Sequence, residues 1–187
     1  MGLLTFKGGV HPNDGKSLAK DQPIKELLPV GDLVYPLSQH IGAPANPVVA
    51  VGDRVLKGQK IAEAGGFVSA PIYASVSGTV KAIEPHFNAT GSKVNCIVVE
   101  NDGAYEEAEH LPAKSLEELS KEEILERIGE AGIVGMGGAG FPTRVKLSPK
   151  EPEKIDYVIA NCAECEPYIT ADYRRMLENT EDLVNGM

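Results

Sequence analysis

A run of glycines between residues 134 and 143 has the residue types that could hold a phosphate or a flat cofactor. Four of six consecutive residues are glycine, namely Gly135, Gly137, Gly138 and Gly140. Backbone without Cβ atoms lets successive N–H groups line an anion site and lets a flat ring lie against the peptide planes. The spacing also fits G-x-G-x-x-G, but Pro142 and Pro149 leave no room for the long helix of a Rossmann site. We therefore expect a ligand-binding loop of another type.

A second loop, residues 157–168, carries the polar side chains of Asn161, Glu164 and Glu166. Carboxylates are poor neighbours for phosphate but accept hydrogen bonds from ribose hydroxyls, so we expect them at the nucleoside end of a ligand. Cys162 and Cys165 have C-x-x-C spacing, yet Cys96 is the one further cysteine in the sequence. Three cysteines can complete neither a four-cysteine cluster nor a closed zinc site, and we predict no metal site.

Together the two loops resemble those that enclose FMN in the flavin- and NADH-binding subunit of respiratory complex I. In that family they have the patterns G-x-G-G-A-G-F-P-T and N-A-D-E-x-E-P. Within the superfamily the chain is more similar to the RnfC subunit of the Rnf ion-translocating electron-transport complex. Residues 6–12, 36–44 and 161–168 carry this resemblance.

The resemblance implies FMN as cofactor, NADH as substrate and a first set of binding residues. Lys146 would supply a point charge to the flavin phosphate. Phe141 would pack against the nucleotide, and a core plug is its open alternative. The flavin phosphate and ring edge would lie against the backbone of Gly135, Gly137, Gly138, Ala139 and Gly140.

In the second loop, the resemblance makes Asn161 a flavin contact and places Glu164 and Glu166 near flavin and nucleotide. Two positions depart from the family pattern: Met136 replaces an arginine and Ala163 replaces an aspartate. Both changes remove polar contacts, which weakens the case for NADH binding more than the case for flavin. The family also carries two [4Fe–4S] clusters on later cysteine motifs, so we expect the chain to be an N-terminal fragment that is inactive alone.

The elements that must position these loops form two parts, and the fold class that we predict is α+β. Residues 35–104 contain short runs of Val, Ile and Ala between glycine turns, and residues 51–55 echo residues 76–80. This pattern looks like the barrel-sandwich hybrid of biotinyl and lipoyl domains. Residues 62–69 hold no lysine, so we expect no covalent prosthetic group and favour a scaffold or docking role.

The remaining segments complete the expected domain organisation. Residues 1–34 should be extended, residues 105–114 an acidic solvated linker, and residues 115–187 the first part of an incomplete α/β flavin-binding domain. A capping box at Ser115 or Ser120 should start a helix that Gly129 or Gly132 ends. A buried strand over residues 155–160 and an amphipathic helix over residues 172–184 should follow.

The charge and hydropathy of the chain limit the classes of partner that it can bind. The chain has 18 Lys and Arg against 27 Asp and Glu, and its net charge of -9 repels nucleic acid and anionic lipid. No apolar run approaches the ~18 residues that span a bilayer, so we expect no direct membrane insertion. His11 and His40 lie beside turn residues without metal-like neighbours, and we interpret them as structural.

The function that we predict is electron transfer from NADH through flavin to iron–sulfur carriers. The chain would be part of an oxidoreductase subunit held by other subunits of a membrane complex, at the cytoplasmic face of a bacterial cell membrane. One alternative is a cobalamin-reductase-type flavoprotein, which shares both loops. A non-catalytic biotinyl- or lipoyl-like docking module is the other alternative.

Overall fold

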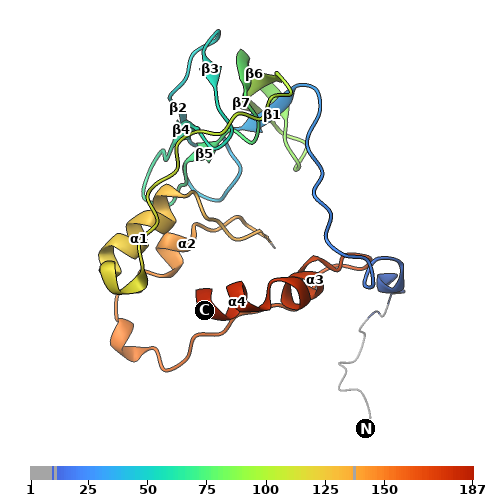
Figure 1. Ribbon diagram of the computed structural model, residues 1–187, viewed down its shortest axis with the longest axis vertical. Helices are drawn as coiled ribbons and strands as arrows, with labels where there is room; N and C mark the ends of the chain where they lie inside the picture. The colour runs from blue at the N-terminus through green and yellow to red at the C-terminus, as the bar shows by residue number, and fades with distance from the viewer. Residues whose placement is uncertain (1–9, 11, 137) are drawn as a thin grey trace. The chain divides into compact units, whose positions relative to one another are not determined.

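The computed structural model describes residue 10, residues 12–136 and residues 138–187. The chain divides into two compact units, and the colours of Figure 1 show which residues belong to each. The β-rich unit is Leu28–Lys154, and the helical unit combines the described residues up to Leu27 with Ile155–Met187. Within the described residues, no helix is both long and apolar enough to cross a membrane.

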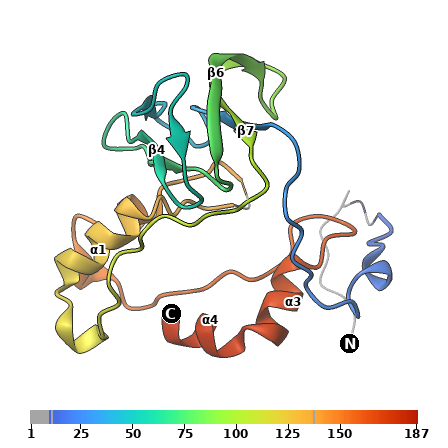
Figure 2. The same ribbon diagram turned by 45° about the horizontal axis from the view of Figure 1, so that its top comes forward.

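Two antiparallel sheets form the barrel-sandwich hybrid of the β-rich unit, in the region where the sequence predicted it (Figures 1 and 2). The larger sheet has the order β1-β7-β6-β3 and the smaller one the order β2-β4-β5. The strands are β1 (Leu33–Pro36), β2 (Asn46–Pro47), β3 (Arg54–Val55), β4 (Lys60–Glu63), β5 (Ile72–Tyr73), β6 (Gly78–Phe87) and β7 (Lys93–Asn101).

β-branched side chains build the core between these strands. Full burial of one such side chain stabilises the fold by about 1.5–3 kcal/mol. The largest fully buried ones are Ile61, Ile97, Val55, Val76, Val80 and Val99.

The two echoing segments pair with each other. The Gly52 N–H donates to Val80 O and the Val80 N–H donates to Asp53 O, both at 2.8 Å. Val55, Val76 and Val80 are buried, but Val51 is 61% exposed. The two segments therefore differ at their first apolar residue, because Val76 lies in the core and Val51 does not.

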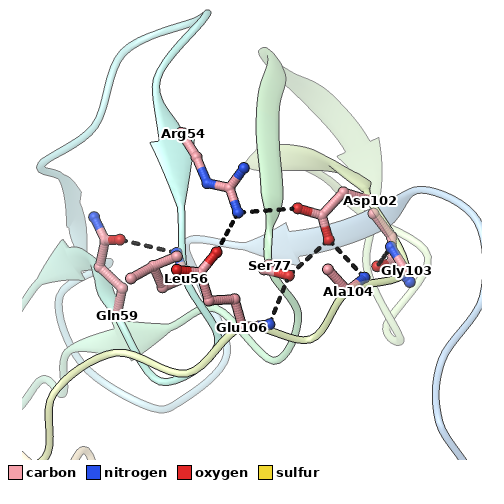
Figure 3. Close-up of polar contacts among 9 residues, drawn as sticks. Arg54, Leu56, Gln59, Ser77, Asp102, Gly103, Ala104 and Glu106 are labelled. Carbon is pink, nitrogen blue, oxygen red and sulfur yellow. Dashed lines mark hydrogen bonds and ion pairs between the residues drawn. The ribbon is translucent and has the colours of Figure 1, made fainter.

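The acidic segment after β7 is not a free linker. Residues 102–108, here called the strap, lie against the barrel (Figure 3). The buried Ser77 hydroxyl donates to Asp102 Oδ1 at 2.6 Å and accepts the Glu106 N–H at 3.0 Å. Arg54 Nη2 lies 2.6 Å from Glu106 Oε2 and 3.5 Å from Asp102 Oδ2. Lys57 exchanges backbone hydrogen bonds with the strap, so side chains and backbone both fix it.

Both predicted capping boxes form. Ser115 caps the 3-10 helix η2 (Leu116–Glu118), and Ser120 caps α1 (Lys121–Glu130). Gly132, with φ +68°, follows the end of α1 in the left-handed region, as a helix-stopping glycine should. α2 (Thr143–Lys146) and the 3-10 helix η3 (Pro152–Lys154) complete this unit.

α1 is joined to the barrel at its last residue. The Tyr73 hydroxyl donates to Glu130 O, and the Lys60 ammonium pairs with the Glu130 carboxylate. The hydrogen bond from the Lys60 ammonium to the Glu130 carboxylate raises the pKa of Lys60. Lys60 is thus a structural residue of the joint.

The helical unit contains the 3-10 helix η1 (Lys16–Leu18), α3 (Ala171–Glu178) and α4 (Thr180–Gly186). The single helix that we expected over residues 172–184 is wrong, because Asn179 has φ -127° and ψ 39° and breaks it. The Asn179 Oδ1 atom accepts from Arg175 Nη1 at 2.9 Å. The Thr180 hydroxyl donates to Met176 O, and such side-chain bonds to the backbone compete with helix continuation.

The buried strand that we expected over residues 155–160 is also wrong. No strand forms there, and Tyr157, Val158 and Ile159 are at least 70% exposed. A strand needs a neighbour for its backbone groups, and among the described residues none pairs with this stretch.

Candidate functional site

The glycine loop, residues 135–140, is closed by its own flanks. The Gly135 N–H donates to Phe141 O at 2.9 Å, and the Thr143 N–H donates to Ile133 O at 2.9 Å. A β-bridge joins Val134 to Pro142. The loop therefore has a fixed base. Its predicted site residue Gly137 lies outside the described residues.

The barrel holds the far end of the loop. The Ile41 N–H donates to Ala139 O at 2.9 Å. Gly140 has φ +62°, and a Cβ there would lie 3.0 Å from Gln39 O. Gly140 is thus required by the backbone conformation and by the close approach of residues 39–40.

Gly138 is a glycine for a different reason. A Cβ built there meets nothing within 4 Å among the described residues, so none of their atoms requires its small size. Gly138 and Ala139 line an open cavity of ≈ 870 Å³, which lies within the range of about 300–1,000 Å³ found for cofactor sites. Its other wall is formed by residues 34–36, 38–41 and 88–90 of the barrel, and the described residues that line it include no Asp, Glu, Lys or Arg.

His40 supports this wall as a structural hydrogen-bond former, as the sequence interpretation expected. Its Nε2 atom accepts the Ala70 N–H at 3.2 Å, and its Nδ1 atom lies 3.1 Å from Ile41 O. The His40 ring therefore links Ile41, whose N–H holds the glycine loop, to Ala70 in the connection between β4 and β5. His11 lies outside the described residues.

The two flanking candidates of the loop differ in burial. Phe141 is half-buried, which is compatible with packing against the nucleotide and also with a core side chain. Lys146 is exposed in the last turn of α2 and makes no ion pair with any described residue. Its ammonium is therefore available to an anionic group.

The acidic loop, residues 161–169, belongs to the helical unit. Asn161 Oδ1 accepts the Ala163 N–H at 3.1 Å, which forms a tight turn. Glu164 Oε1 accepts the Asp172 N–H at 3.2 Å in the first turn of α3. Glu164 Oε2 is buried and finds no hydrogen-bond partner among the described residues. Glu166 is exposed.

The predicted site residues thus lie in two units. The described glycine-loop residues, Phe141 and Lys146 are in the β-rich unit, and Asn161, Glu164 and Glu166 are in the helical unit. Two observations fit a flavin or nucleotide ligand: the open space at Gly138 and the unpaired acceptor on Glu164. A buried acceptor is stabilised when a ligand donor pairs with it.

Two contributors were not predicted from the sequence. Ile41 lies in a stretch that resembles the Rnf family, but its pattern does not reveal the bond to Ala139. Lys16 donates from Nζ to Glu166 O and Ile169 O in the acidic loop, and no local pattern signals this contact. Backbone carbonyls leave no side-chain signature in a sequence.

Two family models match the chain. Residues 4–104 match the RnfC barrel sandwich hybrid domain. Residues 128–187 match the Nuo51 FMN-binding domain, which spans both the glycine loop and the acidic loop.

Similar proteins are C subunits of ion-translocating complexes. The one from the proton-translocating ferredoxin:NAD(+) oxidoreductase complex of Clostridium ljungdahlii is 52% identical over 99% of this chain and 41% of its own length. The one from the Na(+)-translocating complex of Acetobacterium woodii is 43% identical over 98% of this chain and 42% of its own length. A third, from the ion-translocating oxidoreductase complex of Haemophilus influenzae, is 40% identical over 99% of this chain and 29% of its own length. The chain thus spans about two fifths of the length of the first two relatives.

Proposed function

The chain belongs to the RnfC family, and on that premise we propose that it binds FMN for electron transfer between NAD(H) and iron–sulfur carriers. The matched FMN-binding domain over residues 128–187 supports the cofactor. The printed names of two relatives, which give ferredoxin and NAD(+) as their reactants, support the electron-transfer couple.

The open backbone at Gly138 is the observation that carries the proposal. The loop has a fixed base and a tether to the barrel, and at Gly138 it leaves space that no atom of residues 10, 12–136 or 138–187 fills. Gly138 is exposed, so a ligand can approach its bare backbone from outside the loop. The adjoining cavity of ≈ 870 Å³ is large enough for a cofactor.

The described residues divide the task of binding. Backbone N–H groups at Gly138, Ala139 and Gly140 would hold the flavin phosphate and ring edge, with Lys146 as a counter-charge, while the Gly135 N–H closes the base of the loop on Phe141 O. Bound FMN would supply the hydride and one-electron chemistry. The protein's share is to position the cofactor and exclude water from it.

The acidic loop would handle hydroxyl groups. Asn161 would contact flavin, and Glu164 and Glu166 would accept hydrogen bonds from ribose hydroxyls. The unpaired Oε2 of Glu164 supports this assignment.

The names of the relatives also support an assembly. They describe subunits of ion-translocating complexes, and we infer that this chain works with other subunits of such a complex. A peripheral place at the cytoplasmic face of the cell membrane is part of this proposal.

Flavin content tests the proposal. The protein isolated from its native host should release FMN on denaturation, at close to one per chain, and its flavin absorbance should bleach on addition of NADH. A protein that carries no FMN and gains none from added FMN would contradict the proposal.

A further inference from the structure

Lys16 holds the acidic loop from the other end of the chain. Its Nζ atom donates to Glu166 O at 3.0 Å and to Ile169 O at 2.8 Å, across 150 and 153 residues of sequence. One ammonium group thereby bridges two carbonyls on either side of the loop's turn. Charged donors make stronger hydrogen bonds than neutral ones.

The neighbours of Lys16 shape the same turn. The Tyr168 N–H donates to Asp14 O at 2.5 Å. Gly15 is buried beneath the Tyr168 ring, and a Cβ on Gly15 would lie 2.3 Å from two ring atoms. Tyr168 itself has φ +68°, a conformation that a bulky residue keeps only when its surroundings impose it. Residues 14–16 therefore hold residues 166–169 in a strained shape.

The turn that is held this way follows Glu164 directly. Glu164 is fixed at one oxygen by the Asp172 N–H, and its second oxygen is buried and unpaired among the described residues. The backbone that Lys16 holds begins two residues after Glu164, at the carbonyl of Glu166.

We propose that Lys16 is a positioning residue, which holds the acidic loop so that Glu164 Oε2 can accept a ribose hydroxyl of the dinucleotide. The inference rests on the proposed function, because it takes the nucleotide as ligand. Lys16 does not touch the ligand and acts through the carbonyls of Glu166 and Ile169. The N-terminal segment is thus a part of the nucleotide site.

Lys16→Met tests this in the FMN-containing protein, because methionine keeps the length of the side chain and removes its donors. Loss of charged hydrogen bonds should raise the KM for NADH about tenfold, with FMN content and kcat within about twofold of wild type. Lys16→Arg keeps charged donors and should restore most of the affinity. Lys20→Met, on an exposed neighbour in the same segment, is the matched control and should behave as wild type.

A second readout needs no ligand. Cys162 is half-buried and Cys165 is exposed in the acidic loop, whereas Cys96 is buried in the barrel. In Lys16→Met a thiol reagent should label Cys162 several-fold faster, with Cys96 still protected. Gly15→Ala, which displaces Tyr168 and keeps the lysine, should give the same pattern and carries the test if Lys16→Met does not fold.

Each outcome decides one question. A Lys16→Met protein that matches Lys20→Met in KM overturns the proposal, even if Cys162 labels faster, because Lys16 is then a structural latch alone. A wild-type protein without FMN or NADH oxidation overturns the proposed function instead. In that case the labelling rates still show whether Lys16 orders the loop.

Discussion

At the scale of single residues, the glycine loop uses glycine in two ways. Gly140 is fixed by its left-handed backbone and by Gln39 O, which a Cβ would approach to 3.0 Å. Gly138 is exposed, and a Cβ built there meets no described atom within 4 Å, so packing does not limit the side chain at this position. The two positions should therefore respond differently to the same kind of substitution.

Gly140→Ala should destabilise the β-rich unit by more than Gly91→Ala. Both glycines have positive φ, which costs an alanine about 1–2 kcal/mol. A Cβ on Gly91 meets nothing within 4 Å, whereas one on Gly140 presses on the barrel backbone. Urea unfolding of the two variants measures the difference, and equal losses would show that the tether between loop and barrel is loose.

At the scale of elements, the strap shows how charge and burial work together. The Ser77 hydroxyl, the Ala104 N–H and Arg54 favour the charged form of Asp102 and lower its pKa below the ordinary value of 3.8 (Figure 3). A carboxyl with a lowered folded-state pKa adds stability above its unfolded pKa and loses it as the pH falls through the folded value. The strap should therefore loosen in acid.

Asp102→Asn removes that titration. We expect the variant to be less stable than wild type at pH 7, and the difference should shrink as the pH falls below 3.8. The other carboxyls are common to both proteins and cancel in the comparison. Urea midpoints across pH 7 to about 2 test this, and a constant difference would mean that Asp102 does not act through its charge.

The β4–β5 connection should carry no prosthetic group. Residues 62–69 contain no lysine, and Lys60 is paired with Glu130 at the joint with α1. The intact mass of the protein from its native host should show no lipoyl or biotinyl addition. An added mass that maps to residues 35–100 would contradict a purely structural barrel.

Local signals made some of these elements predictable. The Ser120 capping box and Gly132 mark the ends of α1 within a few residues, because the groups that cap a helix are its sequence neighbours. The strand expected over residues 155–160 fails because strand formation depends on a partner. The role of Lys16 was not predictable, because its partners are backbone carbonyls 150 and 153 residues away.

At the scale of the whole molecule, sequence order and structural units differ. The N-terminal residues up to Leu27 join the last residues, Ile155–Met187, in one unit, and the barrel with the glycine loop forms the other. The predicted flavin residues are shared between the two units. The FMN-binding domain model covers both loops.

Gly138→Val tests the central claim, that the glycine loop is a wall of a flavin site. No atom of the described part of the chain lies within 4 Å of the new Cβ, so the fold should keep its stability to within about 1 kcal/mol. The branched side chain would occupy the space that we assign to the cofactor. Gly186→Val, also in open space but far from the loop in sequence, is the control.

The decisive measurement is the FMN content of the Gly138→Val protein isolated from its native host, compared with wild type and Gly186→Val. We predict a folded protein with less than about a tenth of the wild-type FMN, which corresponds to a loss of roughly 1.4 kcal/mol or more in binding. A folded Gly138→Val protein that retains its full FMN would contradict the account, because the open backbone at Gly138 would then have no part in holding flavin.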